Sequence, residues 1–222
     1  MDPVTRVILL DIEGTIGSIS YVHDVLFPYA SARLEAFVRE ADVAGLLADT
    51  RALAGEPEAD LDRAVAILQS WIAEDRKATP LKALQGLIWE EGFRSGALRA
   101  HLYPDAAAAI RRWAQTHTVA IYSSGSVHAQ RLYVRYSDAG DLSGCVKAHF
   151  DTTTGPKRDS ASYLAIAAAL GHASGDVVFL SDVVAELDAA AAAGFRTILV
   201  DRDRPATAGT HRSVADFDGL TP

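Results

Sequence analysis

The 222-residue sequence predicts an α/β fold, a doubly wound parallel sheet with an inserted helical cap. Two observations lead to this prediction. Short apolar runs of the kind found in buried strands alternate with helical patterns over most of the chain, as they do in doubly wound folds. The stretch 19–98 breaks the alternation, because it shows helical patterns and no convincing strand.

The strands are predicted by apolar runs that are rich in β-branched residues and end at a polar or glycine-containing turn. Strands buried on both faces carry such continuous runs, which indicates a parallel sheet covered by helices. A run at Val146–Phe150 is the weakest. The clearer runs are Val7–Leu10, Val119–Tyr122, Val177–Leu180 and Thr197–Val200.

Helical patterns separate these strands. The pattern at Ser160–Leu170 follows Asp159, whose carboxylate can cap the first turn of a helix. Two further helices are expected at Pro104–Ala114 and Val183–Ala193. Strand and helix therefore alternate as a parallel sheet with crossover helices requires.

The stretch 19–98 is predicted to form a separate helical unit, with helices near Phe27–Glu40, Leu61–Glu74 and Leu81–Glu91. Ligands of open α/β sheets bind beyond the carboxyl ends of the strands, and this insertion begins next to that edge, just after the first strand. We therefore expect a catalytic core made of residues 1–18 and 99–222, and a helical cap made of residues 19–98.

The composition excludes several classes of function. The 21 basic and 29 acidic residues give a formal net charge of −8 without a basic cluster, so nucleic acid is not an expected partner. Cys145 is the only cysteine, which excludes an intramolecular disulfide or a multi-cysteine zinc site. No signal peptide is recognisable, and no apolar run approaches the ~18 residues of a membrane span. We expect a cytoplasmic protein without a membrane partner.

Two carboxylates, Asp11 and Glu13, come directly after the first predicted strand. An aspartate is a poor nucleophile toward a phosphoryl group, because the two repel each other. A metal ion can neutralise this repulsion and allow an aspartyl-phosphate intermediate. Taken alone, the motif also fits a solvent-exposed acidic turn.

Polar side chains follow three other predicted strands. Ser123 and Ser124 precede a helical stretch, where hydroxyls and backbone N–H groups can bind phosphate oxygens. Lys157 lies ahead of another helix, where an ammonium can hold the same oxygens. Asp182 follows the strand Val177–Leu180, and carboxylate oxygens are ligands that Mg²⁺ prefers.

Each of these residues alone has an ordinary explanation, such as a helix cap or an exposed lysine. However, the carboxyl ends of parallel strands share one edge of a sheet, so all of them would lie at the same rim. A single site explains this arrangement better than independent coincidences.

The order of carboxylate, hydroxyl, lysine and carboxylate resembles the four motifs of haloacid dehalogenase-type phosphatases. The resemblance implies a Rossmann-like core in which Asp11 attacks phosphorus, Ser123 or Ser124 binds the phosphoryl group, and Lys157 orients it.

The same resemblance gives Glu13 two roles, as general acid and base through its side chain and as a metal ligand through its backbone carbonyl. Asp11 and Asp182 would complete the site for one Mg²⁺ per subunit. Most of the superfamily has aspartate where this chain has Glu13, which narrows the choice of family.

Longer segments resemble the enolase-phosphatase family of methionine salvage, which is similar in size and carries the same helical cap. The segments lie in both the predicted core and the predicted cap: DIEGT at 11–15, DVLFPYA at 24–30, LKALQGLIWEEG at 81–92, YSSGS at 122–126 and FDTTTGPK at 150–157.

This closer resemblance implies a phosphorylated diketone, 2,3-diketo-5-methylthiopentyl-1-phosphate, as the substrate. The enzyme would enolise it and then remove phosphate, which gives the acireductone 1,2-dihydroxy-3-keto-5-methylthiopentene. This small molecule is the one partner we expect, and we expect a monomer.

Two residues depart from the family pattern, because Ile16 and His23 stand where threonine and lysine are more frequent. Both could alter substrate contacts under the cap.

The core motifs alone also fit a generic phosphatase of the same superfamily. A hydrolytic dehalogenase would keep the aspartate nucleophile but need neither the acid at Glu13 nor the metal. A catalytically inactive binding module would not need the intact set of charged residues.

Overall fold

In the computed structural model, which describes residues 5–74, 76–203 and 209–222, the chain divides into two compact units. The first comprises Met1–Ile19 and Arg99–Pro222, and the second comprises Ser20–Leu98. The role of the second unit as a cap stays a prediction. No helix within the described residues is both long and apolar enough to cross a membrane.

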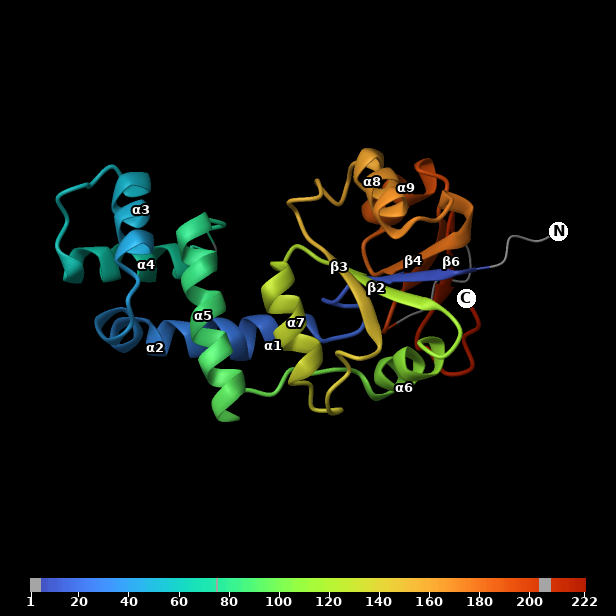
Figure 1. The fold of residues 1–222 in the computed structure, drawn as a ribbon, viewed down its shortest axis with the longest axis horizontal. Helices are drawn as coiled ribbons and strands as arrows, with labels where there is room; N and C mark the ends of the chain where they lie inside the picture. The colour runs from blue at the N-terminus through green and yellow to red at the C-terminus, as the bar shows by residue number, and fades with distance from the viewer. Residues whose placement is uncertain (1–4, 75, 204–208) are drawn as a thin grey trace. The chain divides into compact units, whose positions relative to one another are not determined.

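The first unit contains a six-stranded sheet in the order β3-β2-β1-β4-β5-β6, with every neighbouring pair parallel (Figure 1). This confirms the predicted fold class. The sequence missed β6, because its three residues are too few and too polar to form an apolar run. The strands are β1 Val7–Leu10, β2 Thr118–Tyr122, β3 Val146–Phe150, β4 Val177–Ser181, β5 Arg196–Val200 and β6 Arg212–Val214.

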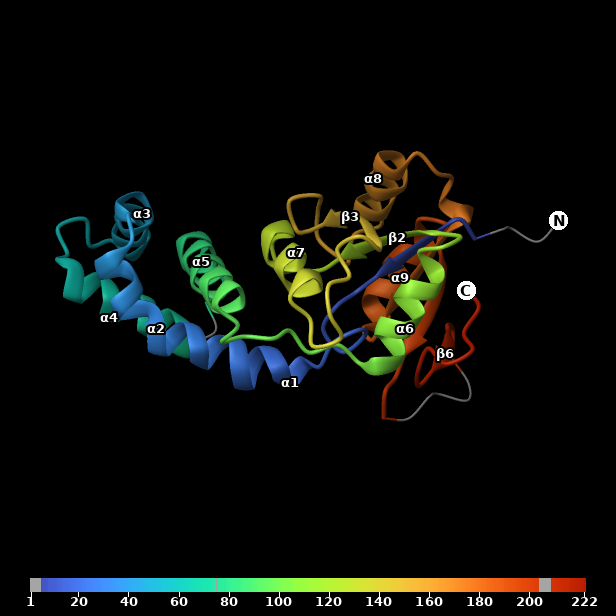
Figure 2. The same cartoon turned by 60° about the horizontal axis from the view of Figure 1, so that its bottom comes forward.

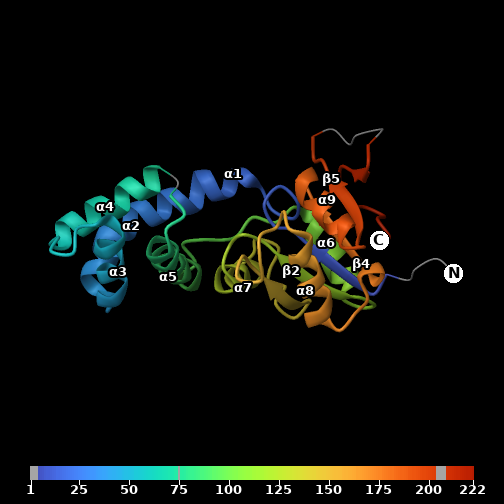
Figure 3. The same ribbon diagram turned by 90° about the horizontal axis from the view of Figure 1, so that it is seen from above.

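Helices cover both faces of this sheet. Helices α8 and α9 lie on one face and α6 on the other (Figures 1 and 3). Side chains alternate between the faces of a strand, so Val7 and Leu9 of β1 share a core cluster with Tyr163 of α8 and Leu187 of α9. Asp159 caps α8 as expected, by accepting the N–H of Ala161. The helices of this unit are α6 Pro104–Trp113, α7 Val127–Arg135, α8 Ser160–Leu170 and α9 Val184–Ala192, with a short 3₁₀ turn at Ser174–Asp176.

The second unit is helical and has its own hydrophobic core, to which α2, α3, α4 and α5 all contribute (Figure 2). The sequence missed α3, which begins at an alanine and a glycine with no capping side chain. Helix α5 is longer than predicted and ends at Gly96, whose φ of 79° is in the left-handed region. The elements are α1 Ile19–Tyr21, a π-helical turn Val22–Leu26, α2 Phe27–Glu40, α3 Ala44–Ala54, α4 Leu61–Ala73 and α5 Thr79–Ser95.

Candidate active site

Asp11 lies at the carboxyl edge of the sheet, in the middle of its strand order. Leu10, the last residue of β1, is in register with Ile121 of β2 and Leu180 of β4. The Asp11 N–H continues this pairing by donating to the Leu180 carbonyl at 3.0 Å. The backbone of Asp11 is therefore held by the sheet, while its side chain lies beyond the strand ends.

Lys157 makes ion pairs with two carboxylates at this edge. Its Nζ lies 2.7 Å from Asp11 Oδ1 and 2.6 Å from Glu186 Oε2. The Lys157, Asp11 and Glu186 side chains are only 10%, 6% and 12% exposed. The Ser181 hydroxyl lies within hydrogen-bond distance of Glu186 Oε2 (3.1 Å) and of Asp11 Oδ2 (3.4 Å). These contacts join β1, β4, α9 and the Lys157 loop in one buried charged network.

Glu186 and Ser181 were given no role by the sequence analysis. Ser181 ends β4, and Glu186 lies in the first turn of the following helix, α9. When a helix directly follows a strand, the first turn of the helix lies close to the end of that strand. An acidic residue four positions after Asp182 was therefore the signal that could have identified Glu186.

The loop that carries Lys157 is fixed by two buried tyrosines. The Tyr163 hydroxyl of α8 donates to the Lys157 carbonyl at 2.7 Å, and the Tyr122 hydroxyl of β2 donates to the Gly155 carbonyl at 2.9 Å. The Lys157 ammonium also lies 5.8 Å from the centroid of the Tyr122 ring. The ammonium is thus held in place by its own loop and not only by its carboxylate partners.

The electrostatics of the network favour a charged lysine. Burial lowers the pKa of Lys157, but Asp11 and Glu186 outweigh this effect and shift the pKa upward. Burial and the nearby charge of Asp11 raise the pKa of Glu186. A single ammonium group therefore neutralises part of the charge of two carboxylates.

Asp182 lies against the loop after β1. Gly14 has a φ of 76°, and a Cβ atom there would overlap the Asp182 carboxylate. Burial, together with the charge of Asp11, raises the pKa of Asp182 to about 6. Its Oδ1 is buried, and in the described part of the chain it has no hydrogen-bond partner. Asp182 is not a helix cap, since α9 has Val183 at its N-cap position.

The two predicted phosphate-binding serines follow β2. Ser123 is buried, and its hydroxyl accepts the Gly125 N–H at 3.3 Å, whereas Ser124 is exposed. The buried amide of Gln130 donates to the carbonyls of Gly125 and Phe150, both at 2.8 Å, and so fastens this loop to the end of β3. The choice between the two serines stays open.

Glu13 is half-buried in the loop after β1, where its backbone forms a bridge with Gly17. Its backbone position, two residues beyond Asp11, fits the role implied by the resemblance. The general acid and base role of its side chain stays a prediction.

The donor set suits a divalent cation. Asp11, Glu186 and Asp182 carry three negative charges when ionised and Lys157 one positive charge, which leaves −2. Such a site would repel a phosphate dianion unless a cation compensated it, and the buried Asp182 Oδ1 has no hydrogen-bond partner among the described residues. No three His, Cys, Asp or Glu side chains in the described ranges could hold a metal. A bound ion would therefore also need backbone or water oxygens, as the Glu13 carbonyl would provide.

A carboxylate beside a buried lysine, with a second aspartate at the same edge of a parallel sheet, defines the class of haloacid dehalogenase-like hydrolases. The sequence model of the haloacid dehalogenase-like hydrolases matches residues 5–194, so the chain belongs to this class. Within it the chain belongs to the enolase-phosphatase family. It is 53% identical to enolase-phosphatase E1 of Pseudomonas syringae pv. syringae (strain B728a), over 98% of this chain and 97% of that protein. It is 54% identical to enolase-phosphatase E1 of Pseudomonas aeruginosa (strain UCBPP-PA14), over 96% of each.

The chain is also similar to solved structures over nearly its whole length. The UTR4 protein of Saccharomyces cerevisiae has a TM-score of 0.85 at 34% identity, over 97% of this chain and 100% of that chain. The hydrolase YfnB of Bacillus subtilis, whose structure contains bound magnesium, has a TM-score of 0.60 at 16% identity, over 97% of this chain and 96% of that chain. At that identity the second likeness shows the fold alone.

Proposed function

We propose that this protein is a bifunctional enolase-phosphatase of methionine salvage. It would convert 2,3-diketo-5-methylthiopentyl-1-phosphate into 1,2-dihydroxy-3-keto-5-methylthiopentene and phosphate. The similarity to curated enolase-phosphatases, at 53% identity over almost the whole chain, supports this substrate. The observation that carries the chemistry is the buried ion pair between Lys157 and Asp11 at the carboxyl edge of the sheet.

We further propose that Asp11, Asp182 and the backbone carbonyl of Glu13 hold one Mg²⁺ per subunit. When bound, this ion would supply Lewis-acid charge that offsets the repulsion between phosphate and carboxylates and stabilises an enolate oxygen. The surplus of negative charge supports this ligand set, as does Asp182 Oδ1, which is buried without a hydrogen-bond partner in the part of the chain that the structure describes.

In the phosphatase step, a carboxylate oxygen of Asp11 attacks phosphorus and the bond to the substrate oxygen breaks. The carboxylic acid of Glu13 gives its proton to the leaving oxygen. The Glu13 carboxylate then takes a proton from water, which attacks the aspartyl-phosphate, releases phosphate and restores Asp11. Lys157 holds the phosphoryl oxygens during both transfers, and Ser123 or Ser124 binds them from the β2 side.

The enolase step precedes this transfer. A base accepts a proton from the carbon beside a carbonyl group, and the electron pair of the broken C–H bond moves into the enolate, which needs positive charge nearby but no attack on phosphorus. The two steps can therefore share one site and still respond differently to substitution.

We propose that the unit Ser20–Leu98 acts as a cap that excludes water during both steps. We also propose that the protein works as a cytoplasmic monomer. The lone free cysteine, Cys145, agrees with a reducing compartment.

The deciding experiment supplies the diketo phosphate to purified protein and follows enol absorbance and free phosphate together, with and without a chelator. We expect enol formation before phosphate release, and loss of phosphate release without Mg²⁺. Faster hydrolysis of simple phosphomonoesters than of the diketo phosphate would favour the generic phosphatase. Full activity in excess chelator would exclude the proposed site chemistry.

A further inference from the structure

The loop that carries Glu13 is closed around a single carbonyl group. The Ile12 carbonyl accepts N–H groups from within the loop, including those of Thr15 at 3.2 Å and Gly17 at 2.9 Å. The Gly14 N–H returns to the Gly17 carbonyl at 2.8 Å. These short-range bonds fix the loop's shape, whereas its position on the sheet depends on contacts with other segments, one of which is the Tyr103 N–H that donates to the Ile16 carbonyl at 2.9 Å.

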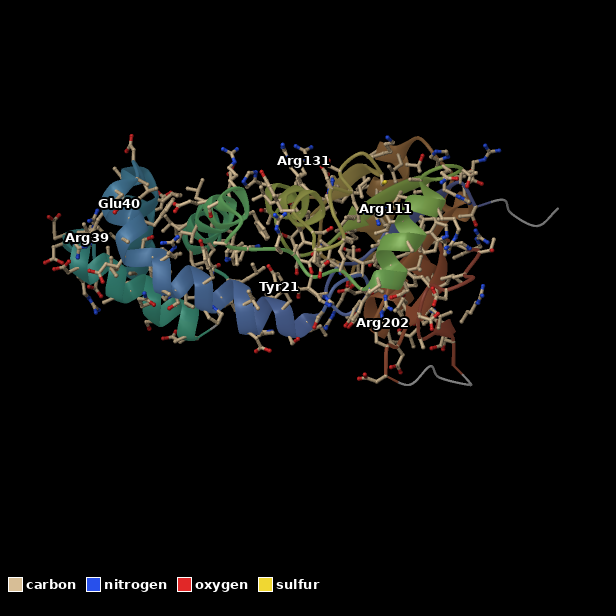
Figure 4. All side chains as sticks on the ribbon, turned by 90° about the horizontal axis from the view of Figure 1, so that it is seen from below. Tyr21, Arg39, Glu40, Arg111, Arg131 and Arg202 are labelled. Atoms are coloured by element: carbon tan, nitrogen blue, oxygen red, sulfur yellow. The ribbon has the colours of Figure 1, made fainter. Side chains whose placement is uncertain are left out.

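Arg202 supplies a contact from outside the loop. It follows β5 and is labelled in Figure 4. Its Nη2 and Nε donate to the Thr15 carbonyl at 2.6 and 3.2 Å, and its Nη1 lies 2.7 Å from Asp105 Oδ2. The guanidinium carbon lies 4.2 Å from the ring centroid of Tyr103 and 4.9 Å from that of Phe217.

These contacts make the guanidinium a rigid support. The Arg202 and Asp105 side chains are only 14% and 15% exposed, so the ion pair is largely shielded from water. A planar guanidinium between two rings and a carboxylate has little freedom to turn. Its two donors therefore point at the Thr15 carbonyl in a fixed direction.

A purely structural role is the alternative. Asp105 Oδ2 also accepts the Phe217 N–H at 2.9 Å, so part of this network holds the C-terminal segment. Another arginine also holds that segment, since Arg112 of α6 donates to the carbonyls of Phe217 and Leu220 at 3.2 and 3.3 Å. Of these two arginines, Arg202 is the one that contacts the Glu13 loop.

We propose that Arg202 is a positioning residue for proton transfer, because it holds the loop that carries Glu13 in register with Asp11. This inference rests on the proposed role of Glu13 as general acid. A displacement of about 1 Å in such a group can cost a large part of its catalytic effect. Nucleophilic attack by Asp11 itself depends on β1 and Lys157, and the hydrogen bonds and ion pair that Arg202 makes within the described residues involve neither.

The test compares leaving groups. The value of kcat/KM covers the steps up to formation of the aspartyl-phosphate, in which an unreactive leaving oxygen needs a proton and p-nitrophenolate does not. We expect Arg202→Met to lower kcat/KM by about tenfold or more for phenyl phosphate, and by less than about threefold for p-nitrophenyl phosphate. Arg202→Lys keeps the charge but not the two parallel donors, so it should show the same selectivity to a smaller degree.

Arg112→Met is the matched control, since it removes from α6 an arginine that holds the same C-terminal segment. It should lower the melting temperature without leaving-group selectivity. If Arg202→Met lowers kcat/KM equally for both esters, or not at all, the positioning role is wrong. If Arg202→Met does not fold, Arg202→Lys decides by the same two criteria.

Glu13→Gln separates this inference from the proposed function on which it rests. If Glu13→Gln shows no leaving-group selectivity, the general-acid role of Glu13 fails, and the role of Arg202 fails with it. If Glu13→Gln is selective and neither Arg202 variant is, the proposed function stands and only the role of Arg202 is overturned.

Discussion

At the scale of single residues, the site is defined by a charge imbalance around Lys157. Two buried carboxylates share its ammonium, and Asp182 adds a third negative charge nearby. Removing one member of a buried ion pair leaves an uncompensated charge, whereas an exposed pair contributes little. Substitutions in this network should therefore change stability and activity in separable ways.

Replacing Asp11, the proposed nucleophile, should remove activity but not the fold. Asp11→Asn cannot form an acyl phosphate, so we expect phosphate release to fall by about 10³-fold or more. Circular dichroism should be unchanged. Asp49→Asn, at an exposed position of α3, is the control and should be fully active. Turnover near the wild-type rate in folded Asp11→Asn would contradict the assignment of the nucleophile.

Removing the shared ammonium should destabilise the protein as well as inactivate it. In chelator, Lys157→Met leaves Asp11 and Glu186 buried without a cation, which we expect to cost about 3 kcal/mol in the free energy of unfolding. Arg63→Met breaks a pair of similar length, 2.6 Å to Glu56, whose side chains are 56% and 38% exposed, and should lower the free energy of unfolding far less. Denaturant titration measures both values.

A double variant checks the cause of that loss. Lys157→Met with Glu186→Gln removes one of the two stranded charges, so part of the stability should return while activity stays absent. Equal stability of the single and double variants would contradict the charge explanation.

Gly14→Ala should weaken Mg²⁺ binding, because the added Cβ would displace the Asp182 carboxylate. Gly55→Ala is a matched control: its φ of 75° is almost the same as the 76° of Gly14, but an added Cβ meets nothing within 4 Å. Both variants should lose about 1–2 kcal/mol of stability from the left-handed backbone. Calorimetric titration should show weaker Mg²⁺ binding in Gly14→Ala alone, and unchanged binding there would count against Asp182 as a ligand.

At the scale of secondary structure elements, the loops of the site are held by buried polar side chains at helix and strand ends. Gln130 of α7 ties the serine loop to β3, and its Oε1 lies 3.3 Å from His149 Nδ1 on β3. Asp151 accepts the Val127 N–H at 3.0 Å and so joins the end of β3 to the start of α7. The end of β3 thus supports the serine loop and the start of α7.

This junction should make stability depend on pH. Burial, with a smaller effect of Arg131, lowers the pKa of His149 from 6.5 to about 4. Between pH 6.5 and about 4, His149 is therefore protonated in the unfolded chain but stays neutral in the folded protein. Protonation of the unfolded chain lowers the free energy of unfolding, so the contribution of His149 to stability is complete above pH 6.5 and is lost as the pH falls toward 4.

The corresponding experiment measures the free energy of unfolding in urea across this pH range. His149→Asn should reduce the decrease in the free energy of unfolding between pH 6.5 and 4 by about 1 kcal/mol. The effect is this small because solvent screens part of the pKa shift at this partly exposed ring. His128→Asn, at an exposed position of α7, is the control for replacing a histidine by asparagine. Parallel curves for wild type and His149→Asn would show that His149 does not cause the dependence.

At the scale of the whole molecule, each unit has a core of its own. One cluster of buried residues is confined to the sheet unit and another to the helical unit. Units with separate cores can in principle fold separately. The proposed cap should therefore be removable without destroying the sheet.

Replacing Ser20–Leu98 by a short linker tests this expectation. The shortened protein should fold, as shown by circular dichroism, and still hydrolyse p-nitrophenyl phosphate slowly. Enolisation of the diketo phosphate should fall by about a hundredfold or more, since the substrate chain would lose its positioning and its shield from water. Unchanged enolisation in the folded variant would contradict the role of the second unit as a cap.

The sequence by itself determined the fold class and the order of the site residues. Apolar runs such as Val7–Leu10 reveal strands because burial on both faces requires continuous apolar side chains. Parallel strands expose their carboxyl ends at one edge, so Asp11, Lys157 and Asp182 could be assigned to one site from their positions after strands. Elements with weak local signals, such as β6 and α3, were not predictable in this way.

Only the tertiary structure decided which groups touch. The bond from Arg202 to the Thr15 carbonyl spans 187 positions, and the contact from Ser181 to Asp11 spans 170. No local pattern encodes such contacts, because they depend on how neighbouring strands are ordered and on where each loop turns back. The same reason explains Glu186, which was visible in the sequence as an acidic residue in a helix. It became a partner of Lys157 only when α9 and the lysine loop met at the edge of the sheet.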